Sequence, residues 1–311
     1  MTRHLFILNP AAGRRDKTPA LTQMIHNLLL SEPYDIFVTD SVCAAERETE
    51  RYIRAYPNDF IRIYACGGDG TVSEVANGIY KSGSKSCALA IIPIGSGNDF
   101  VRSFDLPADR FTNLRALTKA EYIDTDLLLA SDTTGKERVS LNIISAGFDA
   151  AVAKGQEKYK KLPMVNGSTA YNLSLVKCLF SSLKNYFNIL VDGKSFSNRK
   201  NGPYLFVIAA NGKYYGGGFK ASPYSDMRDG LIDLVRIDTV SRLRFIKLVG
   251  IFREGKHLRG HEDIVSFTRC KKMQIVSELP IDLNLDGEII SMRNPTVKVI
   301  PKAINLIIPQ E

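Results

Sequence analysis

The chain has 311 residues, of which 44% are hydrophobic and 24% are charged, a composition typical of a soluble globular protein with about two domains. No run approaches the roughly 20 apolar residues of a membrane span. The N-terminal residues enter a strand directly, so we expect no signal peptide. The five cysteines show no CxxC spacing, which indicates a reducing compartment without a disulfide framework or zinc site.

Charge is distributed unevenly along the chain. Residues 1–126 contain 14 Lys and Arg against 16 Asp and Glu, whereas residues 127–311 contain 27 against 17. The second part therefore carries a net charge of +10, which favours an anionic partner such as a membrane surface or nucleic acid. A basic surface that only keeps the protein soluble explains the same numbers equally well.

The first part of the chain alternates strands and helices. Apolar runs predict strands at 4–8, 34–39, 60–66 and 88–93, and helical spacing predicts helices at 18–31, 44–56 and 72–80. Strands that are almost continuously apolar and separated by helices are typical of a parallel sheet covered on both faces. We therefore expect an α/β domain.

The pattern changes after residue 126. Short strands are predicted at 127–130, 138–144, 204–209, 232–237, 272–276, 281–285 and 296–300, with helices near 170–180 and 241–254. Several of these strands lie close together with turns between them, which favours antiparallel pairing. We predict a β-rich second domain over residues 127–300, while the tail at 301–311 returns to the first domain, residues 1–126.

The chain is organised around the pentapeptide Gly67-Gly68-Asp69-Gly70-Thr71, which joins a predicted strand to a predicted helix. Glycine allows a ligand to approach the backbone closely, and a helix N-terminus favours phosphate. Asp69 stands at the carboxyl end of a strand, where α/β sheets bind ligands. Because a carboxylate repels phosphate, Mg²⁺ is expected between them. The alternative is a glycine-rich turn without a ligand.

Two further turns have the same character. Asn9-Pro10-Ala11-Ala12-Gly13 follows the first strand, and a segment with Gly95, Ser96, Asn98 and Asp99 follows the fourth. The carboxyl ends of parallel strands meet at one edge of a sheet, so the three turns predict a binding cleft there. Neither a Walker A sequence nor GxGxxG is present after the first strand, which excludes the usual nucleotide fingerprints.

Three features of the second part carry weaker signals. Asp226 and Asp229 are three residues apart at a turn and could hold a hard cation, although a plain Asx turn is favoured. Asp286-Gly287 predicts a hairpin, after which Glu288 is either inert or a general base. As a helix, residues 241–256 would be basic and amphipathic and could lie on an anionic membrane, although packing on its own sheet is commoner.

Taken together and in order, the motifs NPxxG, GGDGT, PxGxxND, DG and DGE resemble the diacylglycerol kinase catalytic-domain family, in particular the soluble bacterial lipid kinases. The resemblance implies an N-terminal domain like those of phosphofructokinases and NAD kinases, a C-terminal β-sandwich, and ATP in the cleft. It also implies that Glu288 accepts a proton from the lipid hydroxyl. Asp226, Asp229 and Leu231 are implied to form a structural Mg²⁺ site. Serine at position 96 replaces the usual threonine and keeps the hydroxyl.

The predicted function is that of an ATP- and Mg²⁺-dependent lipid kinase that transfers a phosphoryl group directly to a lipid hydroxyl, with Glu288 and Asp69 in catalytic roles. The residues expected to bind ATP are Asn9, Pro10, Gly13, Thr39, Gly67, Gly68, Asp69, Gly70, Thr71, Glu74, Gly95, Ser96, Asn98 and Asp99. The contacts of Thr39 and of the run from Gly68 to Glu74 are implied by the resemblance.

Two alternatives to this prediction remain: an NAD kinase-like enzyme and a catalytically silent nucleotide- or lipid-binding regulator. We expect a cytoplasmic protein that is peripheral to the inner face of the membrane and binds an anionic surface, with no nucleic acid partner. A homodimer is left open.

Overall fold

The computed structural model describes residues 1–148, 150–152, 154–155, 183–196 and 203–309, so the helix expected near 170–180 lies outside the described residues. The chain forms two compact units, residues 1–126 with 302–311 and residues 127–301.

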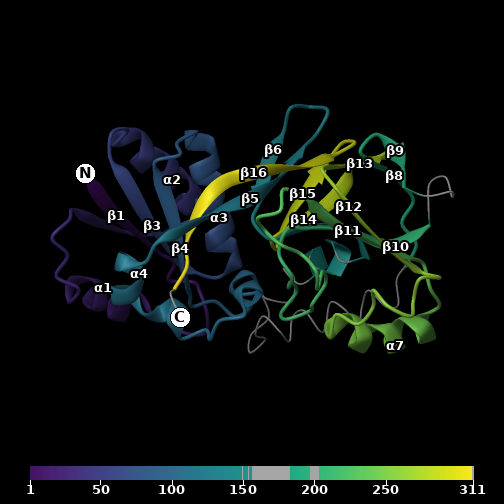
Figure 1. The fold of residues 1–311 in the computed structure, drawn as a ribbon, viewed down its shortest axis with the longest axis horizontal. Coiled ribbons are helices and arrows are strands. Elements are labelled where there is room, and N and C mark those ends of the chain that lie inside the picture. The colour runs from purple at the N-terminus through teal and green to yellow at the C-terminus, as the bar shows by residue number, and fades with distance from the viewer. Residues whose placement is uncertain (149, 153, 156–182, 197–202, 310–311) are drawn as a thin grey trace. The chain divides into compact units, whose positions relative to one another are not determined.

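A parallel sheet forms the centre of the first unit (Figure 1). Its strands are β1 (Thr2–Leu8), β2 (Tyr34–Val38), β3 (Phe60–Gly67) and β4 (Cys87–Pro93), in the order β2-β1-β3-β4. The end of β16 (Thr296–Ile307) joins β4 in parallel. β1, β3 and β4 are largely buried because their sequences are almost continuously apolar. From β1, the chain adds β2 on one side and β3 and β4 on the other, so the topological switch point lies between β1 and β3. Open α/β sheets bind ligands at such a point.

Helices cover both faces of this sheet (Figure 1). α1 (Thr18–His26) and α4 (Leu114–Lys119) contribute to one buried core with β1, β3 and β4. α2 (Ala44–Ala55) and α3 (Asp69–Ser82) pack closely together at Gly78 of α3. A Cβ on this residue would lie only 2.5 Å from the carbonyl oxygen of Glu46 on α2, so glycine permits the close approach. Two 3₁₀ helices, η1 (Phe100–Phe104) and η2 (Arg110–Thr112), follow β4.

The first helix is shorter than its apolar pattern predicts. It ends at His26 instead of Ser31, and Leu29 adopts a left-handed conformation with φ of 52°. Leu28 and Leu30 still pack against the buried core from this turn. Packing of these two side chains therefore overrides their helical propensity.

The second unit contains two antiparallel sheets with a shared hydrophobic core, as expected for a β-sandwich. One sheet has the order β12-β11-β10-β7-β14-β15 and consists of β12 (Val265–Cys270), β11 (Ile232–Asp238), β10 (Tyr204–Ala210), β7 (Ile143–Gly147), β14 (Ile281–Leu285) and β15 (Glu288–Met292). In the other sheet, β13 (Lys272–Val276) lies between the first part of β16 and β8 (Asn188–Val191), and β8 pairs in turn with β9 (Lys194–Ser195). In the same sheet, β5 (Tyr122–Ser131) pairs both with β16 and with β6 (Glu137–Ser140).

The predicted basic helix is α7 (Arg242–Arg253), whose N-cap Ser241 accepts a hydrogen bond from the backbone N–H of Arg244. Phe245 and Phe252 of α7 are buried in a second apolar core with residues of β7, β10 and β11. The helix therefore covers one face of the six-stranded sheet. Within the described part of the chain, no helix is long and apolar enough to span a membrane.

Candidate functional site

The loops that follow β1, β3 and β4 touch one another through glycines at the carboxyl edge of the parallel sheet. A Cβ on Gly95 would lie 2.4 Å from Cα of Gly68, and a Cβ on Gly13 would lie 2.6 Å from the carbonyl oxygen of Ile94. Side chains at these positions would push the loops apart, so only glycine permits this approach. Gly13 also has φ of 81°, which disfavours other residues.

Asn9 and Thr71 join the first of these loops to the start of α3. The Asn9 side-chain amide donates a hydrogen bond to the Thr71 hydroxyl oxygen at 2.9 Å, and the Asn9 backbone N–H donates to the carbonyl of Cys66. The Thr71 side chain occupies the space above Gly67, where a Cβ would come within 2.2 Å of its oxygen. Asn9, Gly67 and Thr71 thus form one contact at the β1–β3 switch point.

Asp69 joins the GGDGT turn to the loop after β4. Its Oδ1 accepts hydrogen bonds from the backbone N–H groups of Asp99 at 2.8 Å and Phe100 at 3.3 Å. Asp99 itself is buried and lies 3.5 Å from the guanidinium of Arg102. The loop also bonds internally, because the Asn98 amide donates to the carbonyl of Gly95 at 2.8 Å. Asp69 and Asp99 are therefore brought to the same edge.

The start of α3 offers open space beside backbone N–H groups. The N-cap residue Gly68 makes no side-chain cap hydrogen bond, and its backbone is extended with φ of −100°. A Cβ on Gly70 would meet no atom within 4 Å, so packing inside the unit does not require glycine there. Glycine in a helix costs up to about 1 kcal/mol relative to alanine. Glycine leaves the backbone open at this helix start, and a helix start is the kind of position where an anionic ligand can approach N–H groups.

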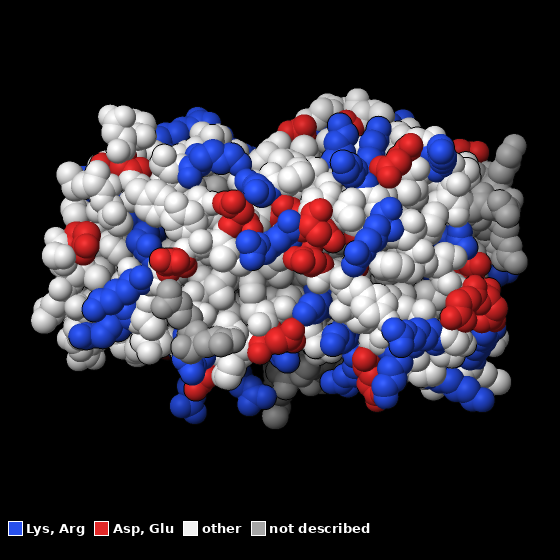
Figure 2. Space-filling model, in the orientation of Figure 1, with Lys and Arg blue, Asp and Glu red and all other residues white. Residues whose placement is uncertain are grey.

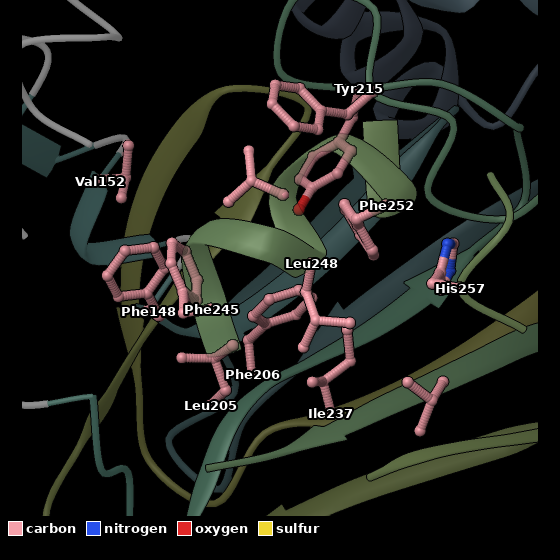
Figure 3. Close-up of a pocket in the computed structure, with 13 residues that line it drawn as sticks. Phe148, Val152, Leu205, Phe206, Tyr215, Ile237, Phe245, Leu248, Phe252 and His257 are labelled. Atoms are coloured by element: carbon pink, nitrogen blue, oxygen red, sulfur yellow. The ribbon is translucent and has the colours of Figure 1, made fainter. Parts of the chain in front are cut away.

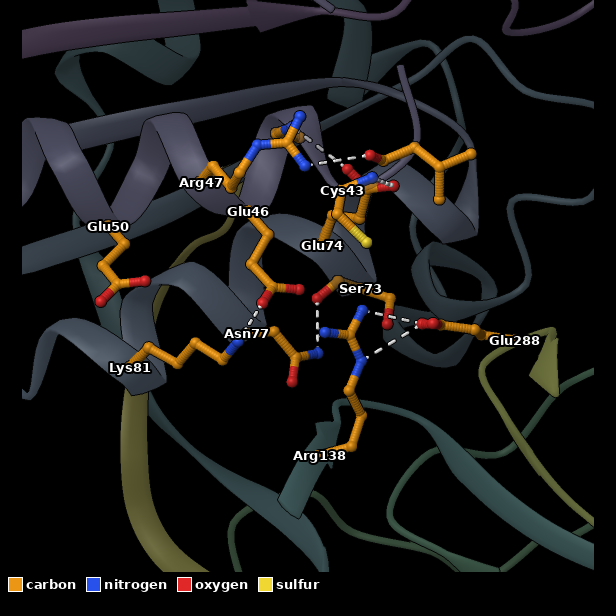
Figure 4. Close-up of polar contacts among 12 residues, drawn as sticks. Cys43, Glu46, Arg47, Glu50, Ser73, Glu74, Asn77, Lys81, Arg138 and Glu288 are labelled. Atoms are coloured by element: carbon orange, nitrogen blue, oxygen red, sulfur yellow. Dashed lines mark hydrogen bonds and ion pairs between the residues drawn. The ribbon is translucent and has the colours of Figure 1, made fainter. Parts of the chain in front are cut away.

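The remaining predicted nucleotide residues have different surroundings. Ser96 is exposed, Pro10 is half-buried, and the backbone N–H of Thr39 donates to the carbonyl of Leu8 at 2.9 Å. Glu74 lies farther along α3, and both of its carboxylate oxygens accept backbone hydrogen bonds at the start of α2 (Figure 4). The structure thus brings most of the predicted nucleotide residues to one edge, whereas the Glu74 carboxylate contacts another helix.

In the second unit, the Asp-Gly turn between β14 and β15 forms the predicted hairpin. Asp286 and Gly287 have φ of 52° and 98°, and Leu285 pairs with Glu288 directly across the turn. The Asp286 carboxylate accepts hydrogen bonds from the Ser140 hydroxyl and from the backbone N–H groups of the next three residues. Burial raises the pKa of Asp286, although these hydrogen bonds act in the opposite direction.

These bonds also explain why the predicted single strand at 138–144 is wrong. The chain divides into β6, which ends at Ser140, and β7, which begins at Ile143. The residues between them direct their N–H groups toward the Asp286 carboxylate instead of a neighbouring strand. Asp286 therefore shapes both the hairpin turn and the β6–β7 junction.

Glu288 forms an ion pair with Arg138 of β6 (Figure 4). Its Oε2 accepts from Nη2 of Arg138 at 2.8 Å and from Nε at 3.2 Å. The Glu288 side chain is 40% exposed, whereas that of Arg138 is only 10% exposed. The sequence analysis did not identify Arg138 as a functional residue. The signal that could have found it is a cationic side chain in an otherwise largely apolar predicted strand.

The predicted metal residues lie in a turn that satisfies much of its own hydrogen bonding. The Asp226 and Asp229 carboxylates accept from the backbone N–H groups of Arg228 and Leu231 at 3.0 and 2.9 Å. Burial raises the pKa of Asp229, and the carboxylate of Asp226 adds to this rise. Among the residues that the structure describes, no cluster of three or more His, Cys, Asp or Glu could hold a metal ion.

An apolar cavity of about 50 Å³ lies within the second unit, under α7 (Figure 3). Aromatic and aliphatic side chains line it, and they include Phe148, Leu205, Phe206, Phe245, Leu248 and Phe252. His257 also lines the cavity, and its burial lowers the pKa of the imidazole to about 4 and keeps the ring neutral at pH 7. Sequence reasoning did not predict this cavity, because its residues are distant in the chain.

Comparisons with known proteins agree with this arrangement. Residues 3–130 match the diacylglycerol kinase catalytic domain, and residues 142–308 match the YegS C-terminal NAD kinase beta sandwich-like domain. A diacylglycerol kinase from Bacillus subtilis (strain 168) is 26% identical, with 100% of this chain and 98% of that protein covered. A protein of Alcanivorax borkumensis named "Probable lipid kinase YegS-like" is 29% identical over 85% of this chain and 84% of its own length.

Solved structures share the fold. A crystal structure of a diacylglycerol kinase from Bacillus anthracis str. Sterne superposes with a TM-score of 0.66 at 20% identity, covering 98% of this chain and 96% of that one. A second structure from this organism, with the same coverage, gives a TM-score of 0.75 at 23% identity. The two family matches span the parallel-sheet unit and the β-sandwich in turn. The chain therefore belongs to the family of diacylglycerol kinases and YegS-like lipid kinases.

Proposed function

We propose that this protein is a lipid kinase that transfers the γ-phosphoryl group of ATP to a lipid hydroxyl, with ATP bound by the first unit and the lipid held by the second. The observation that carries the ATP site is the turn Gly67–Thr71. Its backbone N–H groups begin a helix at the switch point of a parallel sheet, and open space surrounds Gly70. Such a helix start suits the phosphates of a nucleotide.

In this reaction, the carboxylates of the two units have different roles. Glu288 accepts the proton of the lipid hydroxyl, whose oxygen then attacks the γ-phosphorus in line, and ADP leaves. Arg138 orients the Glu288 carboxylate through its two hydrogen bonds. Asp69 and Asp99 offer the oxygen ligands that suit a Mg²⁺ ion, which would neutralise phosphate charge when bound with ATP.

The lipid side of the proposal rests on α7 and the cavity beneath it. Leu243 and Ile246 on the outer surface of α7 are 77% and 59% exposed, and Arg242 and Lys247 beside them are exposed as well. Figure 2 shows Lys and Arg side chains gathered where Figure 1 places this helix. Exposed apolar side chains with basic neighbours favour the surface of an anionic membrane, and the apolar cavity suits part of an acyl chain.

Charge reversal on α7 is expected to weaken membrane binding. Arg242→Glu with Lys247→Glu should raise the apparent Kd for vesicles rich in anionic phospholipid by at least about tenfold, because each basic residue near such a surface contributes about 1 kcal/mol. Vesicle sedimentation at low salt measures the effect. Arg115→Glu with Lys119→Glu on α4 changes the net charge equally and serves as the control. Equal loss in both variants would contradict a docking role for α7.

The turn at Asp226 and Asp229 fits a hard cation in the chemistry of its donors, since Mg²⁺ binds one or two carboxylates and keeps several of its water ligands. A cation there would also relieve the repulsion that contributes to the raised pKa of Asp229. Removal of Mg²⁺ with EDTA is therefore expected to lower the Tm of the wild-type protein by several degrees and that of Asp229→Asn much less. An equal drop in both proteins would remove the metal from this turn.

An acceptor assay tests the proposed function against its two alternatives. The full chain is incubated with γ-labelled ATP, Mg²⁺ and either mixed micelles containing diacylglycerol, phosphatidylglycerol or a sphingoid base, or NAD. A lipid kinase transfers label to a lipid in the organic phase and leaves NAD unlabelled. Label in NADP would identify an NAD kinase, and ATP binding without any transfer would identify a silent regulator.

A further inference from the structure

Glu74 caps a helix other than its own. Its Oε1 accepts a hydrogen bond from the backbone N–H of Cys43 at 3.0 Å, and its Oε2 accepts from that of Ala45 at 3.1 Å (Figure 4). These N–H groups belong to the N-cap and second residue of α2, which has no cap from a side chain of its own N-cap residue. A carboxylate at the positive end of the helix dipole stabilises this arrangement.

The bonds from Glu74 fix the short segment 39–43 between β2 and α2. One end of this segment is held where the N–H of Thr39 donates to the carbonyl of Leu8, and the other end begins α2. Arg47 adds bonds to the Val42 carbonyl at 3.3 Å and to the Ser41 hydroxyl at 3.1 Å. The segment has no regular structure of its own, so its position depends on these contacts.

The same helix that supplies Glu74 begins with the proposed phosphate turn. Glu74 lies five residues after Asp69, or about 7.5 Å along α3 at 1.5 Å per residue. Segment 39–43 follows β2, two strands from β3 in the sheet order, which places it about 10 Å from the turn at the same carboxyl edge. Ribose and base of a nucleotide whose phosphates lie at the turn extend over such a distance.

We propose that Glu74 is a positioning residue that holds segment 39–43 against the nucleoside half of the nucleotide, and that its carboxylate does not contact the phosphates. The inference rests on the proposed ATP site. If Glu74 has this role, loss of its hydrogen bonds must lower the affinity for ligands that carry a nucleoside and leave the affinity for a bare phosphate chain unchanged.

Glu74→Gln tests this expectation while keeping the size of the side chain. The amide oxygen can accept one of the two N–H bonds, but the NH₂ group faces the other N–H donor and cannot. Lys81→Met is the matched control, since it removes the ion pair between Lys81 and Glu46 that joins the same two helices, with Nζ and Oε1 2.5 Å apart. Circular dichroism and thermal unfolding establish that both variants fold.

Calorimetry with ADP and with inorganic tripolyphosphate gives the result. Glu74→Gln should raise the Kd for ADP on the order of tenfold and leave that for tripolyphosphate within about twofold, and Lys81→Met should change neither. Equal weakening of both ligands, or an ADP affinity as high as that of Lys81→Met, overturns the inference. If the wild-type chain binds neither ligand, the proposed ATP site fails, and the role of Glu74 fails with it.

Discussion

Glu288→Gln is expected to lower the kcat for lipid phosphorylation by about 10²–10⁴-fold, the range for loss of a general base. Glutamine has the size of glutamate but does not accept the proton of the attacking hydroxyl. Its amide oxygen still accepts hydrogen bonds from Arg138, so the β14–β15 hairpin and the fold should remain. Rates measured with saturating ATP and lipid, together with calorimetry of ATP binding, separate catalysis from binding.

Asp282→Asn is a suitable control for this experiment, because it removes another carboxylate from the same hairpin. The Asp282 carboxylate pairs with Lys154, and we assign it no chemical role. This variant should keep nearly all of the activity. Asp286→Asn is not a mild control, since the Asp286 carboxylate accepts four hydrogen bonds, and its replacement should lower stability. Full activity of Glu288→Gln would remove Glu288 from the mechanism.

Asp69→Asn is expected to lower kcat by about 10²–10³-fold, the scale for loss of a group that positions charge in the transition state. Asparagine keeps an oxygen that can accept the backbone bonds from Asp99 and Phe100 but removes the negative charge. Asp69→Ala removes both the charge and these bonds, so it should also lower the Tm. The comparison separates the charge of Asp69 from its structural contacts.

Steady-state rates of both Asp69 variants across a range of Mg²⁺ concentrations, with Tm measured alongside, provide the test. If the charge of Asp69 holds Mg²⁺, Asp69→Asn loses activity while it keeps a Tm close to that of the wild type. If Asp69→Asn retains normal turnover at saturating Mg²⁺ and only Asp69→Ala is impaired, then the contribution of Asp69 is structural, and its proposed part in holding Mg²⁺ is wrong.

The sequence allowed the architecture of the first unit to be predicted because local patterns determine it. Apolar strands that alternate with amphipathic helices leave few alternatives to a covered parallel sheet, and the glycine turns then fall at its carboxyl edge. The Asp-Gly hairpin before Glu288 was predictable for the same reason, since both turn residues need positive φ. Each of these features depends on residues that are close in the chain.

Contacts between distant residues could not be predicted. Nothing in the sequence around Glu74 indicates that its carboxylate reaches Cys43, 31 positions away. The break between β6 and β7 depends on Asp286, more than 140 positions later. Arg138 likewise meets Glu288 only because the fold brings β6 and β15 together. In each case the deciding interaction satisfies a buried or partly buried carboxylate, which local propensity does not encode.

The most direct test of the account is the stoichiometry of a single reaction. The purified protein is mixed with γ-labelled ATP, Mg²⁺ and micelles that contain an acceptor lipid, and ADP and labelled lipid are quantified over the same time course. We predict that they form in a ratio of one to one and that ADP formation nearly stops when the lipid is omitted. ADP formation that continues at the same rate without lipid, or no labelled lipid with any acceptor of the panel, would contradict the assignment of this protein as a lipid kinase.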